Sequence, residues 1–273
     1  MTRLLLLLML FFATDIFAEC QPDAISVMSW NIQNLGGSLY RKAPSKEVSE
    51  LETIIQTVKG SDIVAIQEVM VSTGAKAIAL IADGLNRTGA KWDYSVSDPT
   101  SGRGSERYAF LWKTSKVFLV KAWLSQSLSD PLDREPFIGQ FRLKIKTILI
   151  FNLHAVPTAK CPACEIRQIH QEPALTPSGS IRILLGDFNL TASDEAFDGL
   201  KKLGLIARID SKTSLKMKRT RSGVHLANEY DNILTDAPDV CAAGINDFTQ
   251  AFSDFSEARK VSDHIPVFIR FNQ

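Results

Sequence analysis

The sequence predicts a single α/β domain, and three observations support this prediction. Two strand–helix units open the chain after residue 20, several β-type runs follow, and a buried run, Ile183–Leu185, ends directly before Gly186 and Asp187. The 273 residues are 45% hydrophobic and 22% charged, which is typical of a globular protein with a sizeable core. The formal net charge of +1 excludes a global polycation, so any contact with nucleic acid must come from a local patch.

The first 18 residues have the pattern of a secretory signal peptide. Arg3 gives a positive start, an uninterrupted apolar run covers residues 4–12, and Ala18 precedes a tolerable cleavage position before Glu19. The run is far shorter than the roughly 20 apolar residues of a membrane span. We therefore expect a signal peptide over 1–18 and one exported domain over 19–273. We expect this domain to be a secreted or periplasmic monomer without membrane association.

The chain contains four cysteines, Cys20, Cys161, Cys164 and Cys241. An even number in an exported protein indicates disulfides, and three pairings are open. We favour Cys161–Cys164 together with Cys20–Cys241. The CxxC spacing also resembles a redox pair, but no thioredoxin-like pattern surrounds it, and a zinc site lacks two further ligands at suitable spacing.

The first half of the α/β pattern alternates strands and helices. We expect a strand over 24–30 that leads into a glycine-punctuated loop, a helix over 45–59 with one apolar face, a strand over 62–66 and a helix over 74–85. Polar residues follow both strands. Because sites in α/β folds collect at the carboxyl ends of strands, these positions are candidates for function.

The chain then becomes rich in strands. The expected strands cover 92–96, 107–112, 117–122, 137–145 and 148–153, and the second and third of these are expected to form a hairpin. The remaining expected elements are a short helix over 165–171, the buried strand 183–185, a helix capped by Ser193 and ended by Gly204, an irregular basic segment over 212–221, and strands over 229–234 and 265–271.

The polar residues near these strand ends form one chemical set. It is rich in carboxylates, contains two histidines, and includes no serine or cysteine nucleophile motif. Oxygen-rich ligand sets suit Mg²⁺, Mn²⁺ or Ca²⁺ better than zinc. Metal-assisted phosphodiester hydrolysis needs an activated water, neutralised phosphoryl oxygens and a protonated leaving group, and the set has a candidate for each. Its members are Asn31, Glu68, Glu106, Arg107, His154, Asp187, Asn189, Asp231, Asp263 and His264.

These residues lie in motifs that resemble the endonuclease/exonuclease/phosphatase superfamily, and most closely its pancreatic-type deoxyribonuclease I branch. The motifs occur in the family's order and span nearly all of residues 19–273. They are Trp30–Gly36, Ile66–Val69, Ser105–Tyr108, Arg134–Pro136, Asn152–Pro157, Gly186–Asn189, Tyr230–Asp231 and Ser262–Pro266. The resemblance implies a four-layer α/β sandwich in which two mixed sheets pack face to face with helices outside.

The resemblance also implies a metal site. Glu68 would be the principal Mg²⁺ ligand, Asn31 would lie beside it, and Asp263 would lie near the metal. Mn²⁺ is an alternative ion. The family's calcium site is in doubt, because its small disulfide loop is absent although Asp130 and Glu135 remain.

Two histidine–carboxylate pairs are implied as the catalytic groups. Glu106 would orient His154 and Asp231 would orient His264, because a carboxylate on one ring nitrogen fixes the tautomer and raises basicity. One histidine would be the general acid. The general base would be the other histidine or Asp187, as related families differ on this point.

The remaining residues implied by the resemblance concern the substrate. Asn189, with Asp187, would orient the water and the phosphoryl group, and Arg134 would contact a phosphate. Arg107 and Tyr108 would bind substrate, although Arg107 is equally readable as a structural ion-pair partner. The basic segment 212–221 is open between a phosphate-binding and a solvated loop.

Several positions depart from the deoxyribonuclease pattern. Met70 replaces an arginine that reaches into the minor groove, Gly104 and Ser105 replace a tyrosine in a shortened loop, and Asn232 replaces another arginine. All of these affect the grip on substrate. We therefore expect a DNA-binding, Mg²⁺-dependent endonuclease with little sequence preference. The alternatives are a phosphodiesterase or phosphatase acting on RNA or a phospholipid headgroup, a genotoxin subunit of the cytolethal distending type, and a non-enzymatic binding protein.

Overall fold

The structure is a computed structural model that describes residues 19–37, 44–103, 105–175 and 179–273, with the backbone alone described for 44–49 and 173. The expected signal peptide, residues 1–18, lies outside the described part, and so does Gly104. In the part that is described, each helix is too short or too polar to span a bilayer.

The first sheet has the strand order β11-β12-β1-β2-β4-β3. Strands β1 and β2 run parallel, and the other neighbouring strands run antiparallel. The strands are β1 (Ile25–Leu35), β2 (Ile63–Val69), β3 (Trp92–Val96), β4 (Arg107–Lys113), β11 (Val240–Ile245) and β12 (Val267–Phe271).

The second sheet has the strand order β5-β6-β7-β8-β10-β9, with β7 and β8 parallel. Strands β8 and β10 pair antiparallel, which brings the end of one beside the start of the other. The strands are β5 (Phe118–Leu124), β6 (Phe137–Arg142), β7 (Thr147–His154), β8 (Ile181–Asp187), β9 (Ile206–Ala207) and β10 (Asp231–Thr235).

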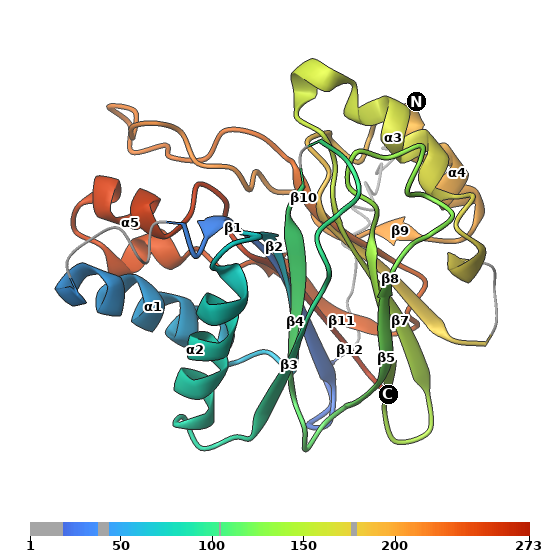
Figure 1. Ribbon diagram of the computed structural model, residues 1–273, viewed down its shortest axis with the longest axis horizontal. Coiled ribbons are helices and arrows are strands. Elements are labelled where there is room, and N and C mark those ends of the chain that lie inside the picture. The colour runs from blue at the N-terminus through green and yellow to red at the C-terminus, as the bar shows by residue number, and fades with distance from the viewer. Residues whose placement is uncertain (1–18, 38–43, 104, 176–178) are drawn as a thin grey trace, which may run out of the picture.

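Helices cover the outer face of each sheet (Figure 1). Those on the first sheet are α1 (Pro44–Val58), α2 (Gly74–Asn86) and α5 (Phe255–Val261), and those on the second are α3 (Pro162–Ile169) and α4 (Asp198–Lys202). Short 3₁₀ helices are η1 (Thr158–Lys160), η2 (Pro173–Leu175), η3 (Glu195–Phe197) and η4 (Phe248–Ala251).

Three apolar cores hold these layers together. The middle core lies between the sheets and includes Phe110, Ile150 and Leu185. A second core joins the first sheet to α1, α2 and α5, and a third joins the second sheet to α3 and α4. Each sheet is therefore apolar on both faces, one packed on the other sheet and one packed on helices. This order of helices, sheet, sheet and helices confirms the predicted four-layer α/β sandwich.

The hairpin expected between residues 107–112 and 117–122 is wrong. Strand β4 lies between β2 and β3 in the first sheet, so both of its edges are already paired. After the turn at Lys113–Lys116 the chain crosses to the second sheet, where β5 pairs with β6.

Three local expectations also differ from the structure. Strand β1 continues past Trp30 to Leu35, because it keeps pairing with β2 after a register shift. Asp194 caps η3 by accepting the amide of Ala196, in the place expected for Ser193. The short helix α3 begins at Pro162, three residues earlier than expected. Strand β11 and helix α5 were not expected at all.

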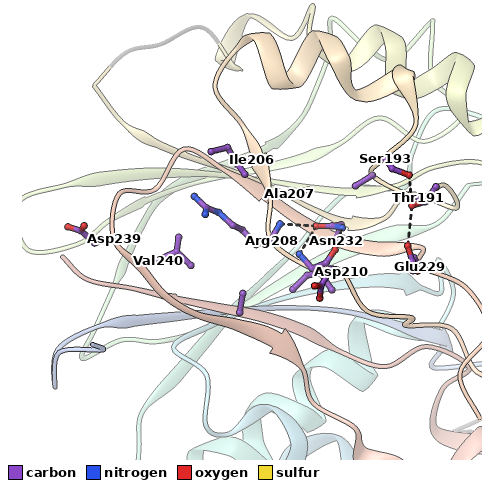
Figure 2. A pocket seen from close by; sticks show the side chains of 13 residues that line it. Thr191, Ser193, Ile206, Ala207, Arg208, Asp210, Glu229, Asn232, Asp239 and Val240 are labelled. Carbon is purple, nitrogen blue, oxygen red and sulfur yellow. Dashed lines mark hydrogen bonds between the residues drawn. The ribbon is translucent and has the colours of Figure 1, made fainter. Parts of the chain in front are cut away.

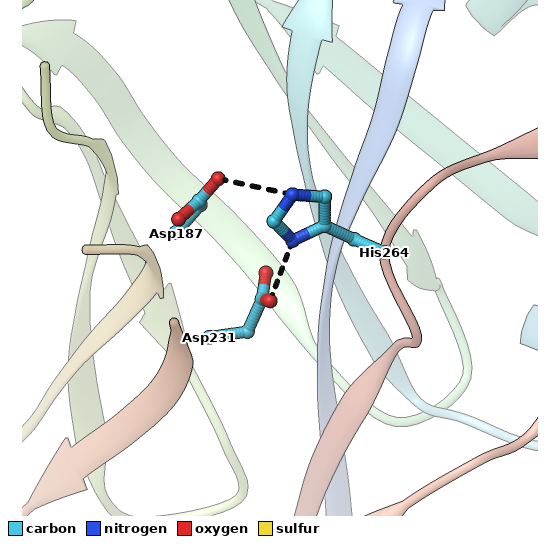
Figure 3. A group of neighbouring side chains, drawn as sticks. All are labelled: Asp187, Asp231 and His264. Atoms are coloured by element: carbon cyan, nitrogen blue, oxygen red, sulfur yellow. Dashed lines mark hydrogen bonds and ion pairs between the residues drawn. The ribbon is translucent and has the colours of Figure 1, made fainter. Parts of the chain in front are cut away.

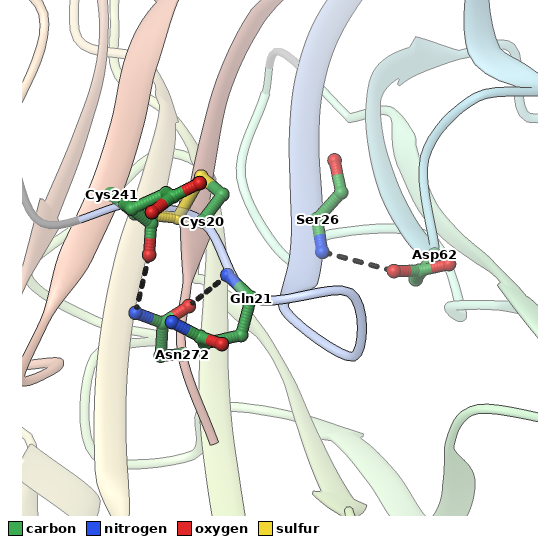
Figure 4. Close-up of a disulfide and its surroundings, with 7 residues drawn as sticks. Cys20, Gln21, Ser26, Asp62, Cys241 and Asn272 are labelled. Atoms are coloured by element: carbon green, nitrogen blue, oxygen red, sulfur yellow. Dashed lines mark hydrogen bonds between the residues drawn. A yellow bond between two sulfur atoms is a disulfide. The ribbon is translucent and has the colours of Figure 1, made fainter.

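The favoured disulfide pairing is confirmed. Cys20 bonds Cys241, and Cys161 bonds Cys164. The first of these links the start of the described chain to β11 (Figure 4), and Gln21 reinforces it by donating its amide to the side chain of Asn272.

Candidate active site

The predicted polar residues meet where strands from both sheets end. A cleft of about 510 Å³ opens at this end of the molecule. Seven of the predicted site residues line it: Glu68, Glu106, Arg134, His154, Asp187, Asn189 and His264.

Asp187 lies at the centre of the site. It pairs in register with His154 on one side and with Asp231 on the other, at the end of β8. Its Oδ2 atom lies 3.6 Å from Nε2 of His154 and 3.5 Å from Nε2 of His264. The side-chain amide of Asn31 also donates to Oδ2, at 3.0 Å. Three donors from three segments therefore converge on one carboxylate oxygen (Figure 3 shows Asp187, Asp231 and His264).

The backbone around Asp187 explains the Gly-Asp-Phe-Asn motif. Gly186 has φ of +139°, and a Cβ there would lie 1.8 Å from the carbonyl oxygen of Leu153. Only glycine allows β7 and β8 to approach this closely. Asn189 has φ of 48°, and this turn lets its backbone amide donate to Oδ1 of Asp187 at 2.9 Å. The turn therefore fixes the carboxylate.

The first histidine pair belongs to β7 and the segment before β4. Nδ1 of His154 lies 3.0 Å from Oε1 of Glu106, and Arg134 donates to Glu106 at 3.1 Å and to the carbonyl of Ala155 at 2.8 Å. Arg134 therefore holds the pair from behind, with its guanidinium already engaged by protein groups. Tyr108 accepts the backbone amide of His154.

The second histidine pair joins the two sheets. Nδ1 of His264 lies 2.7 Å from Oδ2 of Asp231. The hydroxyl of Ser262 accepts the amide of His264 and donates to the carbonyl of Asn31, which fixes the loop before β12 against β1. Each imidazole is thus bound through Nδ1 and turns Nε2 towards Asp187.

The charges of the site depend on each other. Burial opposes protonation of both histidines, but Glu106 raises the pKa of His154 above its usual value, and Asp231 with Asp187 raises the pKa of His264 to about 10. Burial would raise the pKa of Asp187, yet the two imidazoles hold it below its usual value. The two carboxylate-paired imidazoles therefore favour their protonated forms, while Asp187 between them favours its ionised form.

A second polar corner lies on the first sheet. Glu68 has φ of 58°, and its carboxylate accepts from the side chain of Asn31 at 3.0 Å and from the backbone of Asn34 at 2.9 Å. Both partners of the Asn31 amide nitrogen are carboxylates, which fixes the orientation of that amide. The buried Oδ1 of Asn31 has no hydrogen-bond partner among the residues that the structure describes. Asp263 accepts from Gln33 at 2.9 Å.

Two predicted substrate contacts are placed away from the cleft. Tyr108 is 0% exposed and lies behind His154, where its hydroxyl accepts the backbone amide of that histidine. Arg107 points away from the cleft and donates to the carbonyl of Ser97 at 2.6 Å, which favours the structural alternative.

Sequence reasoning missed two features of the site. Arg103 lines the cleft from the loop before β4, and its position between two glycines in a loop beside a motif was the available signal. Below the site, Gln67 of β2 donates to Asn152 of β7 at 2.6 Å and connects the two sheets. Gln67 and Asn152 each lie in one of the family motifs, but the sequence alone does not show that their side chains contact each other.

A larger cavity, of about 1080 Å³, lies at the edge formed by β9 and β11 (Figure 2). Asn232 faces it and accepts the backbone amides of Arg208 and Ile209, both at 3.3 Å. Because neighbouring residues in a strand point to opposite faces, Asp231 points to the active site while Asn232 stabilises this edge.

The comparisons with known proteins agree with this geometry. The family model described as "Endonuclease/Exonuclease/phosphatase family" matches residues 28–264. Deoxyribonuclease-1-like 1 of Sus scrofa is 29% identical over 92% of this chain and 82% of its own, and the Homo sapiens protein of that name is 27% identical over 90% and 83%.

Solved structures share the fold at low sequence identity. TDP2 of D. rerio, complexed with a single-strand DNA product, has a TM-score of 0.62 and 16% identity over 92% of this chain and 99% of its own. A mannosyl-6-phosphatase of Bacteroides thetaiotaomicron has a TM-score of 0.63 and 20% identity over 91% and 100%. The chain therefore belongs to the endonuclease/exonuclease/phosphatase family, on its deoxyribonuclease I-like branch, and is a phosphodiester hydrolase.

Proposed function

We propose that the chain is an exported, Mg²⁺-dependent endonuclease that cleaves DNA with little sequence preference. The observation that carries this proposal is the convergence of two imidazoles and one amide on Oδ2 of Asp187. A phosphodiester carries a negative charge that grows on its oxygens during cleavage. Protonated imidazoles and amide donors arranged around one point would stabilise that charge.

The geometry supports a division of roles. Glu106 and Asp231 stabilise the charged forms of His154 and His264, which suits these histidines to donate protons or hydrogen bonds through Nε2. Asp187 is then the acceptor for the proton of the attacking water. Asn189 lines the cleft beside Asp187, to which its backbone amide donates a hydrogen bond. We assign Asn189 to orient the phosphoryl group.

The residues of the polar corner fit a divalent ion. Within the described ranges, Oδ1 of Asn31 is a buried oxygen without a partner. The Glu68 carboxylate beside it accepts two hydrogen bonds from that part of the chain, which leaves lone pairs for a ligand. We assign Glu68, Asn31 and Asp263 to this ion. When bound, Mg²⁺ would neutralise phosphoryl oxygens and activate water.

A second group of possible ligand atoms lies around Asp187. Asp187, Asp231 and His264 bring their ligand atoms within 4.8 Å of one another. However, His264 and Asp231 already form a 2.7 Å hydrogen bond inside that group. An ion there would break the pair that orients the imidazole, so we favour the corner at Glu68.

DNA and export rest on separate support. The curated relatives are named as deoxyribonucleases, which supports DNA as the substrate. Two disulfides within the described residues, together with the apolar run over residues 4–12, support export to an oxidising compartment, either the periplasm or the exterior. We keep the expectation of a monomer.

Plasmid nicking by residues 19–273 tests the proposal. With Mg²⁺ we expect nicked and then linear plasmid, with EDTA we expect none, and His154→Ala should lose several orders of magnitude in rate. His170→Ala is the matched control, because it removes an imidazole from the exposed end of α3. Intact plasmid with Mg²⁺, Mn²⁺ and Ca²⁺ would exclude DNA as the substrate, and activity on RNA or sphingomyelin would then identify the alternative.

A further inference from the structure

Residues 216–225 form a basic arm that projects from the body of the protein above α5 (Figure 1, orange). The amide of Lys216 donates to the carbonyl of His225 at 2.7 Å, and the amide of Thr220 donates to the carbonyl of Val224 at 2.9 Å. These bonds fold the arm back on itself as a hairpin with its turn near Gly223. At about 3.3 Å per residue, the outgoing limb from Lys216 to Thr220 reaches about 13 Å.

The arm carries one sign of charge. Residues 211–228 contain five lysines and arginines and no aspartate or glutamate. Lys218 and Arg221 are exposed, and neither forms an ion pair with any residue that the structure describes. Such a concentration of free cations on a protein of net charge +1 forms a local patch that attracts polyanions.

The arm is held in place by helix α5. Arg259 donates to the carbonyls of Leu215 and Lys216, both at 3.0 Å. The guanidinium of Arg219 lies over the ring of Phe255, 5.1 Å from its centroid. The ring of His225 bonds Asp247 at 2.8 Å. These contacts anchor the arm that carries the cations at its tip to the body of the protein.

The base of the arm is attached to the active site. Ser214 forms a β-bridge with His264, and the amide of Leu215 donates to the carbonyl of Asp263 at 2.7 Å. The arm thus starts beside one of the two histidines that point at Asp187 and leads away from the cleft. A substrate that fills the cleft and continues on this side would pass along the arm.

We infer that the basic arm binds the phosphate backbone of the nucleic acid a few nucleotides from the scissile bond, and so sets a requirement for polymeric substrate. This inference rests on the proposed function. A reach of about 13 Å spans about four base steps of duplex at 3.4 Å each, which allows Lys218 and Arg221 to contact separate phosphates. The arm has only two large exposed apolar side chains, Met217 and Val224, which is too few for insertion into a membrane.

The test compares two substrates and two charge-matched variants. Lys218→Ala/Arg221→Ala removes two cations from the arm. Lys144→Ala/Lys146→Ala removes two cations next to the start of β7, at the opposite end of the strand that ends at His154. Each protein is assayed with Mg²⁺ on long duplex DNA across a salt series and on bis(p-nitrophenyl) phosphate, which is too small to reach the arm.

For the arm variant we expect the ratio of kcat/KM on DNA to kcat/KM on the small diester to fall about tenfold or more, through KM. The slope of log(kcat/KM) against log[salt] on DNA should become shallower by about 1.8, as expected for two lost phosphate contacts. The control variant should match wild type in both measurements.

The unfavourable outcomes are separable. If wild type cleaves DNA and the arm variant behaves as the control, the inference is wrong and the proposed function stands. If wild type cleaves the small diester but no nucleic acid, the proposed substrate is wrong and the inference falls with it. Arm-dependent binding to vesicles containing phosphatidylserine, without an effect on DNA cleavage, would also overturn it.

Discussion

The two disulfides should contribute very differently to stability, because they close loops of very different length. Cys20–Cys241 spans 221 residues, and Cys161–Cys164 spans 3. A disulfide stabilises the folded state mainly by restricting the unfolded chain, and the loss of entropy grows with the logarithm of loop length. At 25 °C this gives about 5 kcal/mol for the long loop and about 1.6 kcal/mol for the short one.

The perturbation is a pair of serine double variants. Cys20→Ser/Cys241→Ser should lower the free energy of unfolding by up to about 5 kcal/mol, and Cys161→Ser/Cys164→Ser by less than about 2 kcal/mol. With a urea m-value of about 2.5 kcal/mol/M, the midpoint of the first variant should fall by about 2 M and that of the second by less than about 1 M. Hydrogen bonds of Asn272 to Gln21 and to Glu19 remain in the first variant and should keep its native structure (Figure 4).

The assay is urea unfolding followed by circular dichroism, with each variant compared with wild type before and after reduction. Reduction of wild type should reproduce the sum of the two variants. An equal or larger loss from the short-loop variant would refute the loop-length reasoning. It would mean that native contacts around α3 outweigh the restriction of the unfolded chain.

Three further predictions concern the cleft and the arm. Gly186→Ala places a Cβ 1.8 Å from a backbone oxygen of β7 at a positive φ, so we expect a loss of several kcal/mol in thermal unfolding and no plasmid nicking. Arg103→Ala should raise KM for DNA several-fold with little change in kcat, measured by steady-state cleavage, because it removes one exposed cation from the cleft. Asp247→Asn should cost less than about 1 kcal/mol at pH 7, because this carboxylate is only partly buried. Burial would raise the pKa of Asp247, but hydrogen bonds from Thr249 and His225 outweigh it and hold the pKa below its usual value. The stabilisation of the folded state by this carboxylate is therefore fully present above pH 3.8 and disappears as the pH falls through the folded pKa.

Each of these changes has a matched control. A Cβ at Gly60 meets no atom of the described residues within 4 Å, so Gly60→Ala should not destabilise the protein, and an equal loss there would contradict the steric argument. Arg87→Ala removes an arginine from the end of α2 and should leave KM unchanged. For Asp247→Asn, a destabilisation that stays constant between pH 7 and pH 3 in urea unfolding would show that charge is not its cause.

The sequence predicted most elements, because alternation and helical periodicity are local properties. It did not predict which strand pairs with which. Strand β4 reads like half of a hairpin, yet its pairing with both β2 and β3 leaves no edge for β5. Between Val240 and Ile245, strand β11 contains only Cys241, two alanines and a glycine, so its interior lacks the large apolar residues that mark a strand. Partner choice depends on tertiary packing and is not contained in a short run of residues.

The candidate site was predictable where residues occupy strand ends. Asn31, Glu68, His154 and Asp187 lie at or near the carboxyl ends of parallel strands, and such ends meet at one edge. Side-chain direction was harder to predict. Arg107 follows Glu106 in an extended segment, so the two must point to opposite faces, and only Glu106 reaches the cleft. The depth of a side chain below the surface could not be predicted from the sequence. The full burial of Tyr108 was therefore not expected.

The division of the site between two sheets has a consequence for the life of the protein. Asn31 and Glu68 come from the first sheet, Asp187 and Asp231 come from the second, and Gln67 and Asn152 join the sheets beneath them. Neither half contains a complete set of catalytic groups. Hydrolysis therefore requires both sheets to have folded and packed together, so a chain whose sheets have not yet met cannot cleave a phosphodiester.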